Sequence, residues 1–127
     1  MVSKIKQRLA SDEGFTLIEL LVVIVILGIL LAIAVPSYLG FKDRAEKSAA
    51  QSNVRAAVPA VEAWYSDHGT YAGMDATKLK ASYDAGLKVT IGSSPSSSTY
   101  CISATQGAHT FAKAGPAGAI TSAAACT

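Results

Sequence analysis

One apolar segment constrains this chain more than any other part of its sequence. Residues 20–35 are all apolar or glycine, and the segment reaches twenty-one residues when it is taken to begin at Phe15. At 1.5 Å per residue the longer segment spans about 31 Å, which is enough to cross a bilayer core of about 30 Å. The sequence therefore predicts a helix that spans a membrane.

The residues on either side of this segment indicate its orientation. Lys4, Lys6 and Arg8 precede it, so the positive-inside tendency places the N-terminus in the cytoplasm and the C-terminal body outside. A cleaved secretory signal is the alternative, but residues 34–38 give incomplete A-x-A spacing and the run is long for such a signal. A single-pass anchor explains the length and the orientation better.

Glu19 is a lone carboxylate near the start of the apolar segment. A charge at the centre of a membrane helix costs roughly 2.5–3.5 kcal/mol on insertion scales. The positive end of the helix dipole favours an acidic residue in the first turn, but only by about 0.3–1 kcal/mol. A plain anchor needs no carboxylate, so the sequence predicts a further role for Glu19.

The residues from Gly14 to Glu19, Gly-Phe-Thr-Leu-Ile-Glu, and the apolar run after them resemble the N-terminal signature of type IV pilins and type II secretion pseudopilins. The resemblance is specific over residues 14 to about 41 and weaker through the helix to Tyr71. In that family a prepilin peptidase cuts on the cytoplasmic side after the matching glycine and methylates the new N-terminus. The resemblance thus implies that residues 1–14 are a leader, cleaved between Gly14 and Phe15, and that Phe15 is N-methylated.

The same resemblance implies a partner for Glu19. In the family the matching glutamate pairs with the N-terminal ammonium of a neighbouring subunit, which here belongs to Phe15. A cation brought against the carboxylate in low dielectric recovers much of its desolvation cost. Glu19 and Phe15 are therefore the expected assembly residues, and inner-membrane lipid surrounds the helix before assembly.

Gly28 and Pro36 interrupt the apolar segment, and each weakens an α-helix. Related pilins have a helix that unwinds between such a glycine and proline in the filament, which makes these two residues candidates for helix flexibility. Ordinary tolerance of glycine and a proline kink in a membrane helix explains the same pattern. Both interpretations stay open.

Beyond the predicted membrane helix, residues 15–35, an amphipathic helix is expected over residues 36–67. Apolar side chains recur at the spacing of one helical face, with Trp64 alongside and charged residues elsewhere. Pro59 is expected to bend this helix without ending it, and Gly69 suits the position after its last turn. This face, together with Trp64, is expected to lie in the hydrophobic core. It is formed by Val54, Val58, Val61 and Tyr65.

Residues 68–127 are expected to form a small head. Residues 75–83 predict one or two helical turns, and three strand-like stretches at 88–91, 99–103 and 109–113 predict an antiparallel meander. A sheet packed on an amphipathic helix gives an α+β fold, which is also the fold of type IV pilins.

The two cysteines, Cys101 and Cys126, both lie near the C-terminus. On the extracytoplasmic side a disulfide is expected, and it resembles the disulfide loop of type IV pilins. Free thiols or a metal site are the alternatives, although the histidine spacing does not suit a ligand set. No metal or other cofactor is expected.

No catalytic grouping is recognisable in the sequence, so no enzymatic activity is expected. The isolated His68 and His109 suit cap, turn or surface positions.

The net charge of +2 comes from scattered residues, which gives no clear nucleic-acid footprint, although Lys78, Lys80 and Lys88 leave DNA binding open. Residues 93–98 suit a flexible loop or an O-glycosylated one.

The resemblance implies a major subunit of a type IV pilus, a homopolymer in which apolar helices bundle and heads coat the outside. Its expected partners are other copies of itself, prepilin peptidase, and the pilus assembly platform with its motors. Such filaments serve motility, adhesion to surfaces or DNA uptake, and the mature subunit lies on the cell surface. The alternatives are a type II secretion pseudopilin, whose family commonly has a calcium-binding C-terminal loop, and a membrane-anchored extracytoplasmic binding domain. The tail after Phe111 has no acidic residue, which favours a pilin.

Overall fold

The computed structural model describes residue 14 and residues 16–127. The predicted leader, apart from Gly14, and the predicted first mature residue Phe15 lie outside the described residues. The chain divides into two compact units, Met1–Gly40 and Phe41–Thr127. The predicted segment boundaries after residues 14, 35 and 67 stay predictions.

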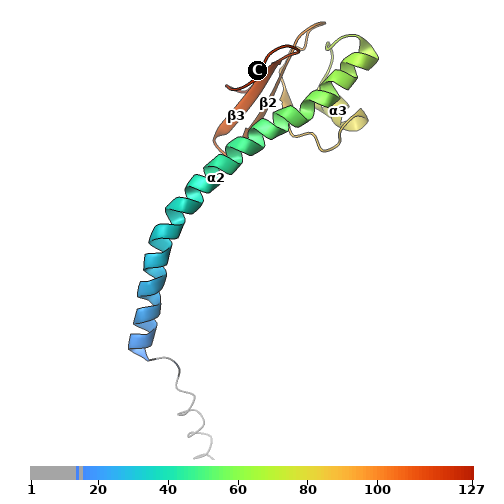
Figure 1. Ribbon diagram of the computed structural model, residues 1–127. Helices are drawn as coiled ribbons and strands as arrows, with labels where there is room; N and C mark the ends of the chain where they lie inside the picture. Colours follow the sequence, from blue (N-terminus) through green and yellow to red (C-terminus); the bar gives the residue numbers. More distant parts are fainter. Residues whose placement is uncertain (1–13, 15) are drawn as a thin grey trace, which may run out of the picture. The chain divides into compact units, whose positions relative to one another are not determined.

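Helix α2 occupies Leu17–His68 (Figure 1). It ends one residue before Gly69, which has a φ of 67° and whose N–H donates to the Tyr65 carbonyl at 2.7 Å. Pro59 lies inside the helix, because the apolar face on both sides of it packs against the head. The predicted helix, including its continuation past Pro59 and its end at a glycine, is confirmed to within two residues at each end.

The head contains a short helix and one antiparallel sheet. Helix α3, Ala76–Ser82, is capped by Asp75, whose carboxylate accepts a hydrogen bond from the Lys78 backbone N–H at 2.8 Å. The sheet has the order β1-β2-β3-β4, and Figure 1 shows β2 and β3 beside the C-terminal part of α2. The predicted α+β fold is confirmed. The strands are β1 Thr90–Ile91, β2 Tyr100–Gln106, β3 His109–Gly115 and β4 Ile120–Ser122.

The predicted three-stranded meander was incomplete. Strand β4 pairs with β3 in the register Phe111↔Ser122, and β2 and β3 each continue two or three residues further than predicted. Small residues surround Ile120–Ser122, so local composition gives this segment little strand preference. The segment becomes a strand because β3 offers it a ladder of backbone hydrogen bonds.

The hydrophobic core lies between one face of α2 and the sheet. Val54, Val61 and Trp64 are buried as predicted, and Val58 packs partly against the core. The prediction for Tyr65 was wrong, because its side chain is 40% exposed. Three alanines belong to the buried face, whereas Tyr65 lies at its edge. The buried alanines of α2 are Ala50, Ala57 and Ala60.

Tyr100 and Gly115 form a close pair across β2 and β3. The Tyr100 ring lies over the glycine so tightly that a Cβ built on Gly115 would overlap the ring. The pair therefore depends on the absence of a side chain at this position, and an aromatic ring covers the glycine in return.

We expect Gly115→Ala to destabilise the head by about 1–3 kcal/mol, the usual cost of overpacking a core. The measurement is denaturant unfolding of the full chain in detergent, followed by the fluorescence of its single tryptophan. In a Tyr100→Leu background the same substitution is expected to cost much less, because the obstructing ring is gone. An equal cost in both backgrounds would assign the effect to the strand backbone.

Candidate functional site

The first turn of α2 fixes the position of Glu19. The Thr16 carbonyl accepts the Leu20 N–H at 3.1 Å, and the Thr16 hydroxyl accepts the Glu19 N–H at 3.3 Å. Thr16 is therefore the N-cap, and Thr-Leu-Ile-Glu has the spacing of a capping box. Glu19 is exposed, and no cation among the described residues lies within ion-pair distance of its carboxylate. The first turn thus presents an exposed carboxylate that has no ion-pair partner among the described residues.

The apolar side chains of the segment are exposed throughout. Every described residue from 16 to 41 is exposed, and this part of α2 is long and apolar enough to cross a membrane. An uninterrupted apolar surface of this length is typical of a membrane-spanning or assembly surface. The predicted membrane-spanning helix agrees with this geometry.

Gly28 and Pro36 both lie within continuous α-helix. Outside its own stretch of helix, no described atom lies within 4 Å of the position that a Cβ on Gly28 would occupy. The predicted unwinding between these residues in a filament stays a prediction.

The predicted disulfide between Cys101 and Cys126 is present. It joins β2 to the C-terminal segment, where the Cys126 N–H donates to the Ser103 hydroxyl at 3.1 Å. Gly92 lies against both cysteines, and its N–H donates to the Cys101 carbonyl at 2.9 Å. The cross-link therefore holds the C-terminal segment over β2 and the residue after β1.

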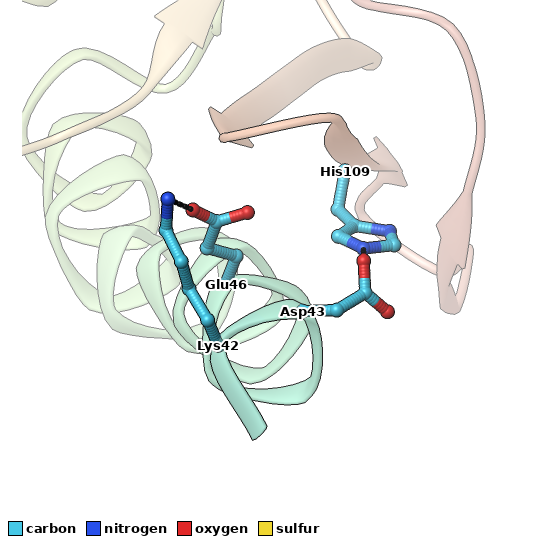
Figure 2. Close-up of polar contacts among 4 residues, drawn as sticks. All are labelled: Lys42, Asp43, Glu46 and His109. Atoms are coloured by element: carbon cyan, nitrogen blue, oxygen red, sulfur yellow. Dashed lines mark hydrogen bonds and ion pairs between the residues drawn. The ribbon is translucent and has the colours of Figure 1, made fainter. Parts of the chain in front are cut away.

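The β2–β3 hairpin contacts α2 through charged side chains, as Figure 2 shows. Nε2 of His109 lies 2.7 Å from Oδ1 of Asp43, and Lys42 pairs with Glu46 at 3.7 Å. A Cβ on Gly107, at the hairpin turn, would overlap the Glu46 carboxylate. His109 therefore positions the hairpin on the helix, in line with the prediction of a turn or surface role.

His68 lies in the last turn of α2. Its ring stacks on Trp64 with the centroids 3.8 Å apart, and its Nδ1 lies 3.0 Å from the Trp64 carbonyl oxygen. A histidine in this position caps the end of the helix, as predicted. Among the described residues no group of three histidine, cysteine or acidic side chains is arranged to hold a metal ion.

Glu62 accepts hydrogen bonds from two buried tyrosines. The Tyr71 hydroxyl donates to the two carboxylate oxygens at 3.2 and 3.1 Å, and the Tyr100 hydroxyl donates to one of them at 3.4 Å. Burial is the main cause that raises the pKa of Tyr71 and the pKa of Tyr100, and the negative charge of Glu62 adds to both shifts. Glu62 thus connects the helix to β2 and to the segment before α3.

This network predicts alkaline unfolding of the head. A raised tyrosine pKa in the fold stabilises the folded state fully below the unfolded value of 10.0, and this contribution is lost as pH rises through the folded value. We therefore expect the phenols of Tyr71 and Tyr100 to ionise after the other tyrosines and only when the fold is lost. One alkaline titration that follows tyrosinate absorbance and tryptophan fluorescence measures both events. Glu62→Gln is expected to reduce the difference between the folded and unfolded pKa values of these tyrosines without abolishing it, because both side chains remain buried. Complete phenol ionisation in a protein that keeps its fold would contradict the prediction.

A hollow of about 320 Å³ lies on the head beside α2. Four small residues of the helix line it, together with Tyr83 and Asp84. Among these lining residues there is no nucleophile beside a histidine that could act as its base. The Tyr83 hydroxyl is already engaged, because it donates a hydrogen bond to Asp67 at 2.6 Å. The helix residues that line the hollow are Ala56, Pro59, Ala60 and Ala63.

Comparison with known proteins connects the N-terminal geometry to a family. Residues 9–35 match the family described as the prokaryotic N-terminal methylation motif. The chain is 42% identical over 60 residues to the type IV major pilin protein PilA of Myxococcus xanthus, covering 47% of this chain and 27% of that protein. It is 44% identical over 62 residues to a fimbrial protein of Neisseria meningitidis serogroup B, covering 49% of this chain and 36% of that protein.

The N-terminal half of the chain is type IV pilin-like. The chain is also 41% identical over 64 residues to the type II secretion system core protein G of Klebsiella michiganensis, covering 50% of this chain and 45% of that protein. The alignments thus span about a quarter to a half of the length of these relatives. No solved structure matches the chain.

Two features of the chain were not predicted from its sequence. The capping box at Thr16 and Glu19 was readable from the spacing of these residues alone. The Glu62 network had no such signal, because Tyr71 and Tyr100 lie 9 and 38 residues further along the chain.

Proposed function

We propose that this chain is the structural subunit of a type IV pilus filament. In this proposal a prepilin peptidase removes residues 1–14 and methylates Phe15. Copies of the chain then polymerise through their apolar helices, with the heads outside. The methylation motif at residues 9–35, continuous with a helix whose apolar side chains are exposed, carries the proposal.

The first turn of α2 supports an assembly role for Glu19. The Thr16 cap and the helix start hold this residue in the first turn, where the resemblance expects the pairing carboxylate. A neighbouring copy offers the ammonium of its mature Phe15 as the counter-ion. This pair fixes the relative height of two apolar helices, which slide freely on each other in lipid because hydrocarbon contacts have no register of their own.

The precursor is proposed to lie in the inner membrane with its N-terminus in the cytoplasm. The assembly platform and motors of a pilus system are its proposed machinery, and the mature subunit lies on the cell surface. Motility, adhesion and DNA uptake are alternative uses of the same filament.

A type II secretion pseudopilin is the second candidate function. The observation that favours it is the 41% identity to core protein G, which is close to the 42% identity to PilA. The two functions differ in their products, because a pilus subunit gives surface filaments and a pseudopilin supports secretion of other proteins. Deletion of the gene, with electron microscopy of the cells and assay of their secreted proteins, separates the two.

Intact-mass measurement of protein sheared from the native host tests the proposed processing. The expected mass is that of residues 15–127, raised by one methyl group and lowered by two hydrogens for the disulfide. Full-length chain confined to the membrane, with none in the sheared fraction, would leave an anchored extracytoplasmic domain as the better function.

A further inference from the structure

Three basic residues of α2 have no acidic partner. Arg44, Lys47 and Arg55 are exposed, and no carboxylate in the described part of the chain lies within ion-pair distance of their charged groups. At 3.6 residues per turn, these three positions fall within an arc of about 80° on one side of the helix. They form a basic stripe.

The acidic residues beside the stripe are already paired. Asp43 contacts His109, and Glu46 contacts Lys42. Neither carboxylate lies within ion-pair distance of the cations of the stripe. Such a group of exposed cations is available to an anion outside the chain.

The first two cations of the stripe follow the apolar segment closely. Residues 21–41 also span about 31 Å, and a bilayer core placed on them ends at Phe41, which is 71% exposed. Phe41 is the last large apolar residue before the charges, and aromatic rings are enriched at the headgroup level of membranes. From Phe41 the rise along a helix is about 4.5 Å to Arg44, about 9 Å to Lys47 and about 21 Å to Arg55. The headgroup layer of one leaflet is about 5–8 Å thick. Long side chains at the first two positions reach this layer, whereas Arg55 lies beyond it.

We propose that Arg44 and Lys47 bind the phosphate groups of anionic phospholipids in the leaflet on the C-terminal side of the membrane-spanning segment. The arginine fork forms two parallel hydrogen bonds to a phosphate, and the lysine adds a point charge one turn further along the same side of the helix. This contact sets the depth of the precursor before assembly. It rests on the membrane-spanning precursor of the proposed function.

The contact is measured on the full chain reconstituted in phosphatidylcholine vesicles that contain phosphatidylglycerol. Electron spin resonance of spin-labelled lipids gives the preference of the protein for phosphatidylglycerol over phosphatidylcholine. R44Q/K47Q is expected to lower this preference by about fivefold or more, because each cation near a membrane surface contributes about 1 kcal/mol. R55Q/K88Q removes the same charge at exposed sites farther along the chain and is expected to leave the preference unchanged.

Three results would overturn the proposal. An unchanged preference in R44Q/K47Q excludes a headgroup contact, and an equal fall in both double variants shows a diffuse effect of net charge. Cross-linked dimers that depend on Arg44 and Lys47, with lipid preference unchanged, assign the stripe to a second copy of the chain. Alkaline carbonate extraction separates this proposal from the proposed function, because a chain that leaves the vesicles in carbonate overturns both, whereas an integral chain without lipid preference overturns this one alone.

Discussion

Glu19→Ala is expected to abolish sheared surface filaments while the membrane-bound precursor accumulates at the wild-type level or above it. Loss of the carboxylate removes the counter-ion for the neighbouring Phe15 ammonium, so apolar helices meet without a fixed register. Membrane insertion does not suffer, because removal of a charge from an apolar helix lowers its insertion cost by roughly 2.5–3.5 kcal/mol at the helix centre. Immunoblots of sheared and membrane fractions measure the two quantities separately.

Matched variants distinguish the charge of Glu19 from its place in the helix cap. Thr16→Ala removes the cap, typically at a cost of about 1 kcal/mol, but keeps the carboxylate, so filaments are expected at a reduced level. Glu19→Gln keeps the shape and removes the charge, so its filaments are expected to be lost. Asp84→Ala removes a carboxylate of the head and is the control. Normal filaments from Glu19→Gln would contradict the ion pair and leave the residue with a capping role.

Local sequence signals predicted the long helix and most of its buried face. Each signal depends on residues that are close together in the sequence. The signals are the apolar segment, the recurrence of Val54, Val61 and Trp64, and Gly69 after the last turn. Local signals suffice to predict a helix because its backbone hydrogen bonds are made within the helix itself. The error at Tyr65 arose because the width of a buried face depends on the partner that covers it, which the spacing of residues along one helix does not show.

Distant contacts accounted for the features that the sequence did not reveal. Strand β4 exists through its pairing with β3, and Glu62 acquires its two tyrosine donors only when β2 and the segment before α3 come together on the helix. The pairing of Asp43 with His109 spans 66 residues. The disulfide was predictable, because only two cysteines were present and they offer a single intramolecular pairing.

Removal of the disulfide, as Cys101→Ser with Cys126→Ser, is expected to destabilise the head by about 3.5 kcal/mol on the chain-entropy estimate for a loop of this length. The effect is large because little else holds the C-terminal segment. Residues 121–125 are exposed, and the Ser93 N–H donates to the Thr127 carbonyl at 3.3 Å. Denaturant unfolding of the full chain in detergent, followed by tryptophan fluorescence, gives the loss. An exposed Ser122→Ala change is the control and is expected to cost little.

The same double variant shows where the cross-link acts. Ser103 is only 1% exposed, and the Cys126 N–H is the partner of its hydroxyl. Release of the C-terminal segment exposes this hydroxyl to water, so amide hydrogen exchange is expected to quicken over β4 and the edge strand β1, whereas the β2–β3 hairpin keeps its protection through its own ladder. If unfolding and exchange both match the wild type, then pairing of β4 with β3 and the hydrogen bond to Ser103 hold the segment without the disulfide. The sulfur bridge would then add protection against proteolysis but not equilibrium stability.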